Sequence, residues 1–277
     1  MIQIHQSCER AEPVSLLGVD YTRLKTKDGG DFYLTRFGLP FLPQLAPENW
    51  YAPDWFAARR VRLKGTSTIY RVPTKPVNGL SLNLVVRFSR MAQEIPLAPA
   101  ILNENAQAEF NSPFEEFGLL MQLRSAHLTG TGPQIFTKKP LAIYEPPELL
   151  ENWQTGRLES KMAAMLARHP ETELDMRRQY LVVYGWIKGL NALEAAQGLG
   201  ISGQAVEKFL WEFTLRAIHD MEQHGFRVVD MKPEHVVVRI LPDGSLLRLR
   251  TGNPAYALID YELLERIPDT SSRGCVI

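Results

Sequence analysis

The sequence predicts an α+β protein with a β-rich N-terminal part that carries one helix, followed by a mostly helical C-terminal part. Between residues 14 and 90, half-alternating apolar runs are separated by turn sequences such as KDGGD and PVNG, a pattern typical of strands. From about residue 148 to 224, apolar residues recur at helical spacing. Because the two parts differ in composition, we expect two lobes with a junction near residues 145–148 and a cleft between them.

The β-rich part begins with the run 15–38, SLLGVDYTRLKTKDGGDFYLTRFG, which predicts two strands joined by a hairpin turn at KDGGD. Residues 39–55 are rich in proline and aromatic side chains, and we expect a loop there. Three further runs have strand character: FAARRVRLKG, STIYRVPTK and LSLNLVVRFSR. The PVNG sequence predicts the turn before the third of them.

The spacing of apolar residues changes from strand-like to helical at NSPFEEFGLLMQLRSAHL, and we predict a helix there. Ser112 is a suitable N-cap, Pro113 suits the first helical position, and Glu115 completes a capping box. Apolar side chains then recur at helical spacing at Phe114, Phe117, Leu120 and Met121. Strand character returns in QIFTKK and LAIYEPPE and ends at a proline pair.

The C-terminal part is expected to be helical up to Gly225, which is a plausible C-cap. Short strands follow in VVVRIL, SLLRLR and AYALID, with PDG as a turn. We therefore divide the chain into three expected regions. These are an N-terminal extension with a β-hairpin (1–50), an N-lobe (51–147) and a C-lobe (148–277).

Composition and charge exclude several classes of protein. The chain has 31 basic and 31 acidic residues, so no global field draws it to nucleic acid or to an anionic membrane. Cys8 and Cys275 do not form a disulfide framework and suit a reducing compartment. The N-terminus lacks a signal-peptide pattern, and no apolar run approaches the roughly 20 residues that span a bilayer. We expect a cytoplasmic protein.

Acidic and basic side chains gather at the ends of short apolar strands near the C-terminus. Asp230 and Lys232 lie in VVDMKPEHVVV (228–238), while Asp260 closes the apolar strand-like run YALID and Glu262 follows two residues later. Phosphoryl transfer needs carboxylates that bind Mg²⁺, a cation near the moving phosphoryl group and a carboxylate near the acceptor hydroxyl. An ordinary polar turn is the alternative, because Asp, Lys, Pro and Glu all favour turns.

VVDMKPEHVVV resembles the catalytic loop of the protein-kinase-like superfamily, whose pattern is H-R-D-x-K-P-x-N, and ALIDYE resembles its D-F-G segment. The resemblance implies a two-lobed kinase-like fold that binds ATP and Mg²⁺. It implies that Asp230 orients the acceptor hydroxyl and that Lys232 steadies the γ-phosphate. The metal would be held by Asp260 with His235 and Glu262.

The resemblance extends upstream and covers roughly residues 55–265. VRLKGTSTIYRV resembles a phosphate-covering hairpin with Gly65, Thr66 and Ser67 at its bend. LVVRF resembles the strand that carries the family's phosphate-binding lysine, with Arg87 in its place, and Glu116 matches the partner glutamate. LAIYEPPE resembles the fifth strand and hinge, which implies that the backbone from Glu145 to Pro147 faces adenine.

Three departures from the family pattern shape the functional hypotheses. Val228 replaces the first histidine of the motif, His235 replaces the asparagine and Arg87 replaces the lysine. Lipopolysaccharide-core sugar kinases of this superfamily are similar in having histidine at the place of His235. Because only 17 residues follow Asp260, we expect no helices that bind protein substrates. The expected acceptor is a small molecule or a sugar.

Two alternatives stay open. The changed Val228 and Arg87 suit a catalytically impaired pseudokinase or regulatory nucleotide-binding module, since arginine does not replace lysine conservatively at a tight phosphate contact. The stretch 190–213 resembles a DNA-binding helix-turn-helix, but its second helix offers Gln204, Glu207 and Lys208 and is nearly neutral. We therefore interpret this stretch as two packed helices and expect nucleic acid not to be a partner.

For single residues, a purely structural role is the alternative to a functional one. Arg87 could be a surface arginine on an edge strand, and Glu116 could be a first-turn residue favoured by the helix dipole. His235 could be a semi-buried histidine without a metal. We expect Tyr184, Trp186 and Trp211 in the core.

Overall fold

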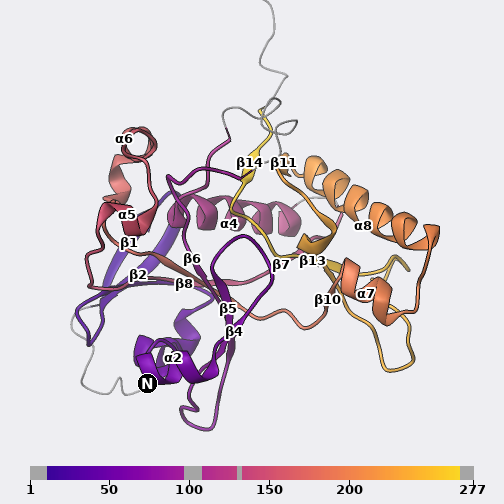
Figure 1. Ribbon diagram of the computed structural model, residues 1–277, viewed down its shortest axis with the longest axis horizontal. Coiled ribbons are helices and arrows are strands. Elements are labelled where there is room, and N and C mark those ends of the chain that lie inside the picture. Colours follow the sequence, from indigo (N-terminus) through magenta and orange to yellow (C-terminus); the bar gives the residue numbers. More distant parts are fainter. Residues whose placement is uncertain (1–10, 97–107, 130–132, 269–277) are drawn as a thin grey trace, which may run out of the picture. The chain divides into compact units, whose positions relative to one another are not determined.

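The computed structural model describes residues 11–96, 108–129 and 133–268, and the chain has a mixed α+β structure with a large antiparallel sheet (Figure 1). The chain divides into two compact units. Unit 1 comprises Met1–Pro96, Glu109–Gly118 and Lys139–Trp186, and unit 2 comprises Leu97–Ala108, Leu119–Lys138 and Ile187–Ile277. Cys8 and Cys275 lie outside the described residues.

Unit 1 contains the large sheet, in which the described strands pair antiparallel throughout in the order β1-β2-β3-β8-β9-β6-β5-β4. The first three strands, expected in a separate extension, continue the same sheet because β3 pairs with β8. The bounds are β1 (Glu12–Leu16), β2 (Val19–Lys25), β3 (Asp31–Thr35), β4 (Val61–Arg62), β5 (Ile69–Pro73), β6 (Asn83–Phe88), β8 (Pro140–Glu145) and β9 (Leu181–Gly185).

Both predicted turns of the β-rich part are confirmed. The β2–β3 hairpin closes through Thr26 N–H, which donates to the Gly30 carbonyl over 3.0 Å. Gly30 is needed there because a Cβ would lie 2.6 Å from the carbonyl oxygen of Glu145. In PVNG, Asn78 and Gly79 both adopt positive φ, at 53° and 75°, as residues of a tight turn commonly do.

Two predictions are wrong in part: the loop rich in proline and aromatic residues, and the strand expected after it. Short helical turns occupy much of this stretch, and helix α2 (Pro53–Arg59) takes the first residues of the run expected as a strand, of which β4 keeps Val61 and Arg62. Pro53 is at the start of α2, Asp54 lies in its first turn and Phe56 buries its ring. These local helix signals outweigh the alternation in FAARRVRLKG. The other turns are η1 (Leu39–Phe41), α1 (Leu42–Leu45) and η2 (Pro47–Asn49).

Helix α4 (Pro113–Thr129) begins where the capping box predicts. The Ser112 backbone N–H donates to Glu115 Oε2 over 2.7 Å, and the Glu115 N–H donates to Ser112 Oγ over 3.1 Å. Two N–H groups that the helix itself cannot satisfy thus obtain acceptors. The predicted capping box is confirmed.

The expected helical run from 148 to 224 is interrupted by β9, so that prediction is wrong over LVVYG. These residues are apolar, partly β-branched and almost fully buried, and they pair with β6 and β8. Helices α5 (Asn152–Thr155) and α6 (Glu159–Arg168) and the turn η3 (Pro170–Thr172) precede β9. Residues 148–186 belong to unit 1, which differs from the expected boundary at 147/148.

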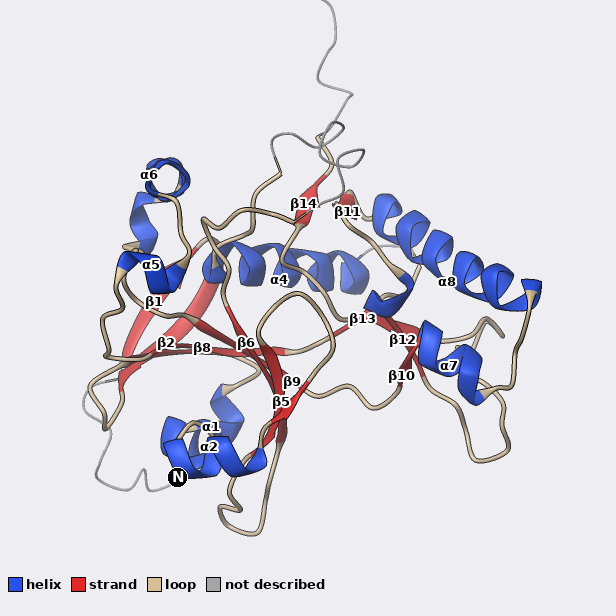
Figure 2. Ribbon diagram, viewed as in Figure 1, coloured by secondary structure: helices blue, strands red, loops and turns tan. Residues whose placement is uncertain are grey.

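Unit 2 contains two small sheets and two consecutive helices (Figure 2). Strands β10 (Leu190–Asn191), β12 (Val236–Val238), β13 (Tyr256–Leu258) and β7 (Phe136–Thr137) form one sheet in that order, with β13 and β7 parallel. Strands β11 (Phe226–Val228) and β14 (Leu264–Arg266) form the other. The helices are α7 (Ala192–Gly198) and α8 (Gln204–Gln223). SLLRLR, expected as a strand, forms only isolated bridges.

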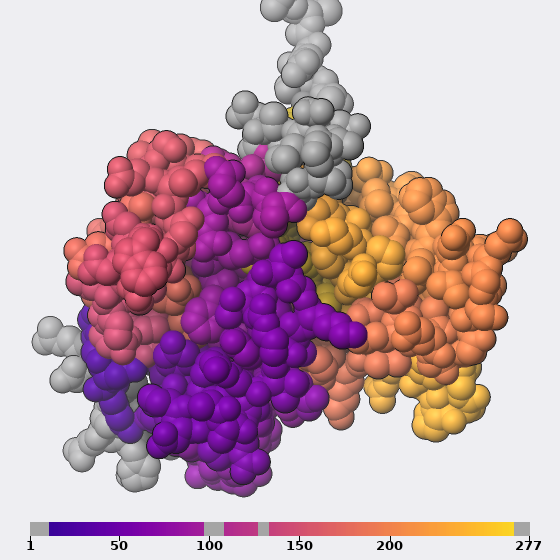
Figure 3. Space-filling view, viewed as in Figure 1, coloured from indigo at the N-terminus to yellow at the C-terminus, as the bar shows by residue number. Residues whose placement is uncertain are grey.

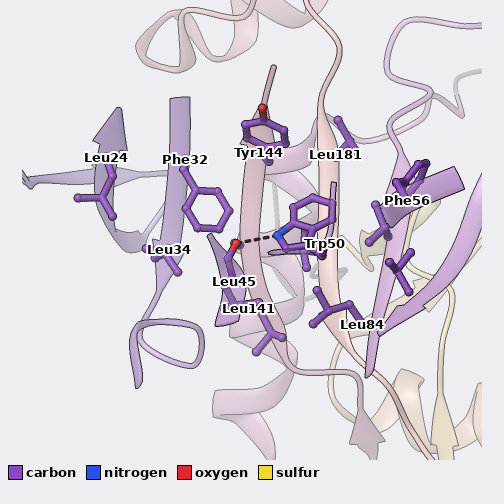
Figure 4. Packing of buried hydrophobic residues seen from close by; sticks show 14 residues of the cluster. Leu24, Phe32, Leu34, Leu45, Trp50, Phe56, Leu84, Leu141, Tyr144 and Leu181 are labelled. Carbon is purple, nitrogen blue, oxygen red and sulfur yellow. Dashed lines mark hydrogen bonds between the residues drawn. The ribbon is translucent and has the colours of Figure 1, made fainter. Parts of the chain in front are cut away.

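The main core of unit 1 gathers side chains from the large sheet and from the short helical turns (Figure 4). Trp50 is fully buried, and its indole N–H donates to the Leu45 carbonyl over 2.7 Å. The polar end of a large apolar ring is thereby satisfied inside the core. Within the described part of the chain, no helix has the length and apolar character that crossing a membrane requires.

Candidate functional site

Two loops of unit 2 run side by side and carry most of the residues singled out from the sequence. Loop 229–235 leads from β11 to β12, and segment 259–263 leads from β13 to β14. Because β12 pairs with β13 and β11 pairs with β14, both loops join the same two strand pairs. Hydrogen bonds tie the loops at each end: Val229 N–H donates to the Leu263 carbonyl and Ile259 N–H to the His235 carbonyl, each over 3.1 Å.

Loop 229–235 carries the predicted acceptor-side pair. Lys232 Nζ lies 2.9 Å from Asp230 Oδ2, with the lysine half-exposed and the aspartate largely covered. The turn η4 (Pro233–His235) follows, where the His235 N–H donates to the Lys232 carbonyl. Pro233 fixes its own φ at the start of that turn. A carboxylate and an ammonium group are therefore presented together from one short loop.

His235 and Asp260 are brought together across the two loops. Asp260 Oδ2 lies 3.4 Å from His235 Nε2. The Asp260 carboxylate is one-third exposed, whereas the imidazole is mostly buried. His235 Nδ1 is buried and has no hydrogen-bond partner among the described residues. The structure thus brings together two of the three residues that the resemblance assigned to a metal.

The residues after Asp260 form a tight, buried turn. The Glu262 N–H donates to Asp260 Oδ1 over 3.3 Å, and the Glu262 side chain is buried. The Tyr261 hydroxyl donates to the Leu258 carbonyl and accepts the Lys138 N–H over 3.1 Å. Asp260 is thus the exposed carboxylate of a segment whose neighbours are covered.

The donor set can be compared with what Mg²⁺ requires. No group of three or more His, Cys, Asp or Glu side chains is placed to hold a metal ion within the described ranges, so His235, Asp260 and Glu262 do not form a three-residue cage there. Mg²⁺ is commonly held by one or two carboxylates together with substrate phosphates and water. Asp260 fits that requirement. An imidazole suits a hard oxygen-seeking ion poorly, and His235 is better placed to orient Asp260.

Unit 1 holds the predicted ion pair in a buried setting. Arg87 and Glu116 are 6% and 1% exposed, and Arg87 Nη2 contacts Glu116 Oε2. Arg87 lies on β6 between β5 and β9, so the interpretation as a surface arginine on an edge strand is wrong. The Tyr184 hydroxyl on β9 donates to Glu116 Oε1. Both oxygens of this carboxylate are therefore engaged inside unit 1.

Unit 1 has a hairpin at the place where the resemblance implies a phosphate-covering one. Val61 pairs with Arg71 and Arg62 with Tyr70, and the chain bends between them through residues 63–68. Gly65 has φ +143° and open space around it, which favours glycine over other residues. Thr66 is exposed and Ser67 is buried. The bend places small polar residues where the sequence predicted them.

Glu145 and Pro147 lie at and beyond the end of β8, in unit 1. Glu145 is directly opposite Asp31 on β3, and Arg178 Nε lies 3.6 Å from Glu145 Oε1. Burial, together with the charge of Asp31, raises the pKa of Glu145 to about 7. The chain passes from unit 1 to unit 2 after Trp186, not at these residues. An adenine contact at 145–147 stays a prediction.

A hollow of about 230 Å³ lies beside loop 229–235, against α8 and β11. Met221 and Ile218 supply apolar walls, and Val229 and Met231 come from the loop. Pockets that enclose drug-sized ligands usually measure at least about 300 Å³. This hollow is smaller than such pockets, and we assign no ligand to it.

Helices α7 and α8 are in contact, as expected for the stretch that resembles a helix-turn-helix. Ala195 and Ala196 are fully buried, and Asn191 caps α7 by accepting the Glu194 N–H over 2.8 Å. On α8, which lies at the surface in Figure 3, Lys208 pairs with Glu212. Trp211, expected in the core, is 66% exposed, so that prediction is wrong. Trp186 is half-buried and Tyr184 is fully buried.

Two tyrosines with evident roles were not singled out from the sequence as site residues. Tyr184 holds the second oxygen of Glu116, and Tyr261 anchors the segment that carries Asp260. Tyr184 was assigned only to the core, and Tyr261 occurs inside the quoted ALIDYE. A buried aromatic hydroxyl normally needs a hydrogen-bond partner, but the sequence does not reveal which one.

Comparison with known proteins adds little to this geometry. No family model matches the chain, and no curated protein matches it. Among solved structures, the kinase domain of BubR1 is similar with a TM-score of 0.41 and 9% sequence identity. The match covers 94% of this chain and 54% of the other, so this chain spans about half of that chain's length. A TM-score this low does not establish a shared fold.

Proposed function

We propose that this protein is an ATP- and Mg²⁺-dependent phosphotransferase of protein-kinase-like fold that acts on a small-molecule or sugar acceptor. One observation carries the proposal. Loop 229–235 and segment 259–263 lie side by side, and the first carries the Asp230–Lys232 pair and His235, which lies next to Asp260 on the second. Positioning and charge stabilisation are what phosphoryl transfer demands of a protein, and this pair of loops provides groups for both.

The proposed roles follow from exposure and charge. Asp230, a carboxylate within reach of solvent, orients the acceptor hydroxyl, and Lys232 places its ammonium near the γ-phosphate. Asp260 supplies the carboxylate that binds Mg²⁺, with His235 fixing its orientation. When bound, Mg²⁺ neutralises charge on the phosphate oxygens. In unit 1, the proposal assigns Arg87 and Glu116 to phosphate positioning, Gly65 to Ser67 to phosphate covering and Glu145 to Pro147 to adenine.

The substitution Asp260→Asn tests the metal assignment at the centre of the proposal. It removes the charge that attracts Mg²⁺ while keeping size and hydrogen-bonding capacity. Titration calorimetry with ATP should show at least about tenfold weaker binding in the presence of Mg²⁺, equivalent to about 1.4 kcal/mol. In EDTA the substitution should change little.

Asp243→Asn is the matched control. Asp243 also accepts a backbone hydrogen bond two residues on, from the Ser245 N–H over 2.9 Å, but it lies in an exposed turn of unit 2. The nucleotide affinity of Asp243→Asn should equal that of the wild type. If Asp260→Asn binds Mg²⁺·ATP as tightly as Asp243→Asn, Asp260 is not a metal ligand and the proposal loses its main support.

A second candidate function is an impaired, nucleotide-binding regulatory module on the same fold. The observation that favours it is the tight engagement of Arg87, whose guanidinium is buried against Glu116. An arginine held in this way is less free to follow a phosphate than the compact, flexible ammonium of lysine. This candidate predicts nucleotide binding without turnover.

A further inference from the structure

Tyr261 anchors the segment that carries Asp260 at two points. It is 1% exposed, its hydroxyl donates to the Leu258 carbonyl, and the same oxygen accepts the Lys138 N–H over 3.1 Å. The Lys138 ammonium lies 5.8 Å from the centre of the Tyr261 ring. A single hydroxyl therefore links segment 259–263 to the end of β7, 123 residues earlier in the chain.

The anchors on either side of Asp260 leave its backbone little freedom. Before it, the Ile259 N–H donates to the His235 carbonyl; after it, the Tyr261 carbonyl accepts the Leu264 N–H over 3.2 Å. The Glu262 N–H contacts the Asp260 carboxylate directly over 3.3 Å. The bonds made by the Tyr261 hydroxyl add an anchor that depends on a single side-chain atom, which a phenylalanine would remove.

We propose that Tyr261 is a positioning residue that holds the Asp260 carboxylate in its metal-binding orientation. This inference rests on the proposed function and adds a residue to it. Tyr261 does not contact nucleotide or metal; it acts through the turn 258–261, which its hydroxyl closes against the Leu258 carbonyl. Groups that orient a metal ligand in this way typically change metal affinity by about 10- to 100-fold when they are removed.

Removing the hydroxyl has a defined structural consequence. The Leu258 carbonyl loses a donor and the Lys138 N–H loses its acceptor, and both residues are buried, at 1% and 4% exposure. Buried polar groups that lose a hydrogen bond drive local rearrangement, because the lost bond is costly. The turn then relaxes, and the Asp260 carboxylate samples orientations that bind a cation less well.

The test compares Tyr261→Phe with Tyr256→Phe. Tyr256 is an ideal control because it is equally buried, lies on β13 in the same unit, and donates its hydroxyl to Asp220 Oδ2 over 2.7 Å. Binding of Mn²⁺, which accepts the oxygen ligands of Mg²⁺, is followed by electron paramagnetic resonance in the presence of ATP. We expect Tyr261→Phe to weaken Mn²⁺ binding by about 10-fold or more, and Tyr256→Phe to leave it unchanged.

Thermal midpoints of both variants separate positioning from stability. Each variant loses one buried hydroxyl, so similar midpoints with different Mn²⁺ affinities support the inference. Equal Mn²⁺ affinity in Tyr261→Phe and the wild type overturns it while leaving the proposed function intact. A wild-type protein that binds no Mn²⁺·ATP contradicts the proposed function and this inference together.

Amide hydrogen exchange provides a measurement that does not depend on the variant's folding. In the wild type, Mn²⁺ with ATP should slow exchange of the Lys138 amide, because ordering Asp260 tightens the turn that presents the Tyr261 hydroxyl. Unchanged exchange at Lys138 on saturation with Mn²⁺·ATP overturns the inference. In Tyr261→Phe, the same amide should exchange faster than in the wild type.

Discussion

Arg87 and Glu116 form a buried ion pair that joins a central strand of the large sheet to the first turns of α4. Arg87 lies on β6 and Glu116 on α4, and the carboxylate receives a second hydrogen bond from Tyr184. Burying two charges is costly, and the cost is offset only while both partners are present. The pair therefore makes unit 1 sensitive to any change that removes one charge.

The substitution Glu116→Gln should lower the free energy of unfolding by about 3 kcal/mol, because it removes the charge of the carboxylate that the buried Arg87 guanidinium contacts. Urea denaturation measures the difference. Glu265→Gln is the control, since Glu265 pairs with Arg227 at the surface and should cost less than about 1 kcal/mol. Equal losses in the two variants would show that the pair in unit 1 is not buried as described.

Arg87→Lys distinguishes an active enzyme from the impaired alternative. If Arg87 takes part in turnover, Arg87→Lys should reduce the rate of ADP release from Mg²⁺·ATP by about tenfold. The reason is that lysine lacks the planar guanidinium that holds Glu116. Arg71→Lys, on neighbouring β5 with its guanidinium on Asn83, should leave turnover unchanged. A gain of turnover in Arg87→Lys would favour the impaired module instead.

The stability contributed by Glu145 should depend on pH with the sign opposite to that of an acid whose pKa is lowered in the folded protein. Burial and the opposing Asp31 raise its pKa to about 7 in the folded protein, whereas the unfolded chain releases the same proton near pH 4.5. Between these values the folded state binds more protons than the unfolded state. The stability contributed by protonated Glu145 is therefore fully present below about pH 4.5 and is lost as pH rises through 7.

Glu145→Gln should remove this loss. Relative to the wild type, the variant should gain up to about 3 kcal/mol of unfolding free energy between pH 4.5 and 8, as measured by urea denaturation across that range. Glu148→Gln changes an exposed carboxylate three residues away and should track the wild type at every pH. A constant difference between Glu145→Gln and the wild type would contradict the raised pKa.

Signals confined to a few neighbouring residues were read correctly from the sequence. The Ser112–Glu115 capping box and the turn at Gly29–Gly30 depend on hydrogen bonds and sterics within a short stretch. Strand β9 was missed because LVVYG is buried and therefore shows no alternation of apolar and polar residues. A short apolar run of this kind does not distinguish a strand from a helix. Helix α2 was missed because the Pro53 start signal was assigned to a loop.

In the candidate site, too, residues in local motifs could be recognised from the sequence, whereas residues that act through distant contacts could not. Asp230, Lys232, His235 and Asp260 were recognisable because each lies in a motif beside a short strand. Tyr184 and Tyr261 act through contacts 68 and 123 residues apart in the chain. Such pairings are set by strand order and register, which the sequence pattern alone does not specify. The burial of Arg87 follows from β9, the strand that the sequence failed to predict.

The most direct test of the central claim is the thermal midpoint of the wild-type protein with ATP, measured with and without Mg²⁺. A ligand that binds only the folded state adds about 2.7 kcal/mol at 100 times its dissociation constant. The proposal predicts a rise in midpoint with ATP that is clearly larger when Mg²⁺ is present. No shift under either condition would contradict it, and loop 229–235 would then be an ordinary turn between strands.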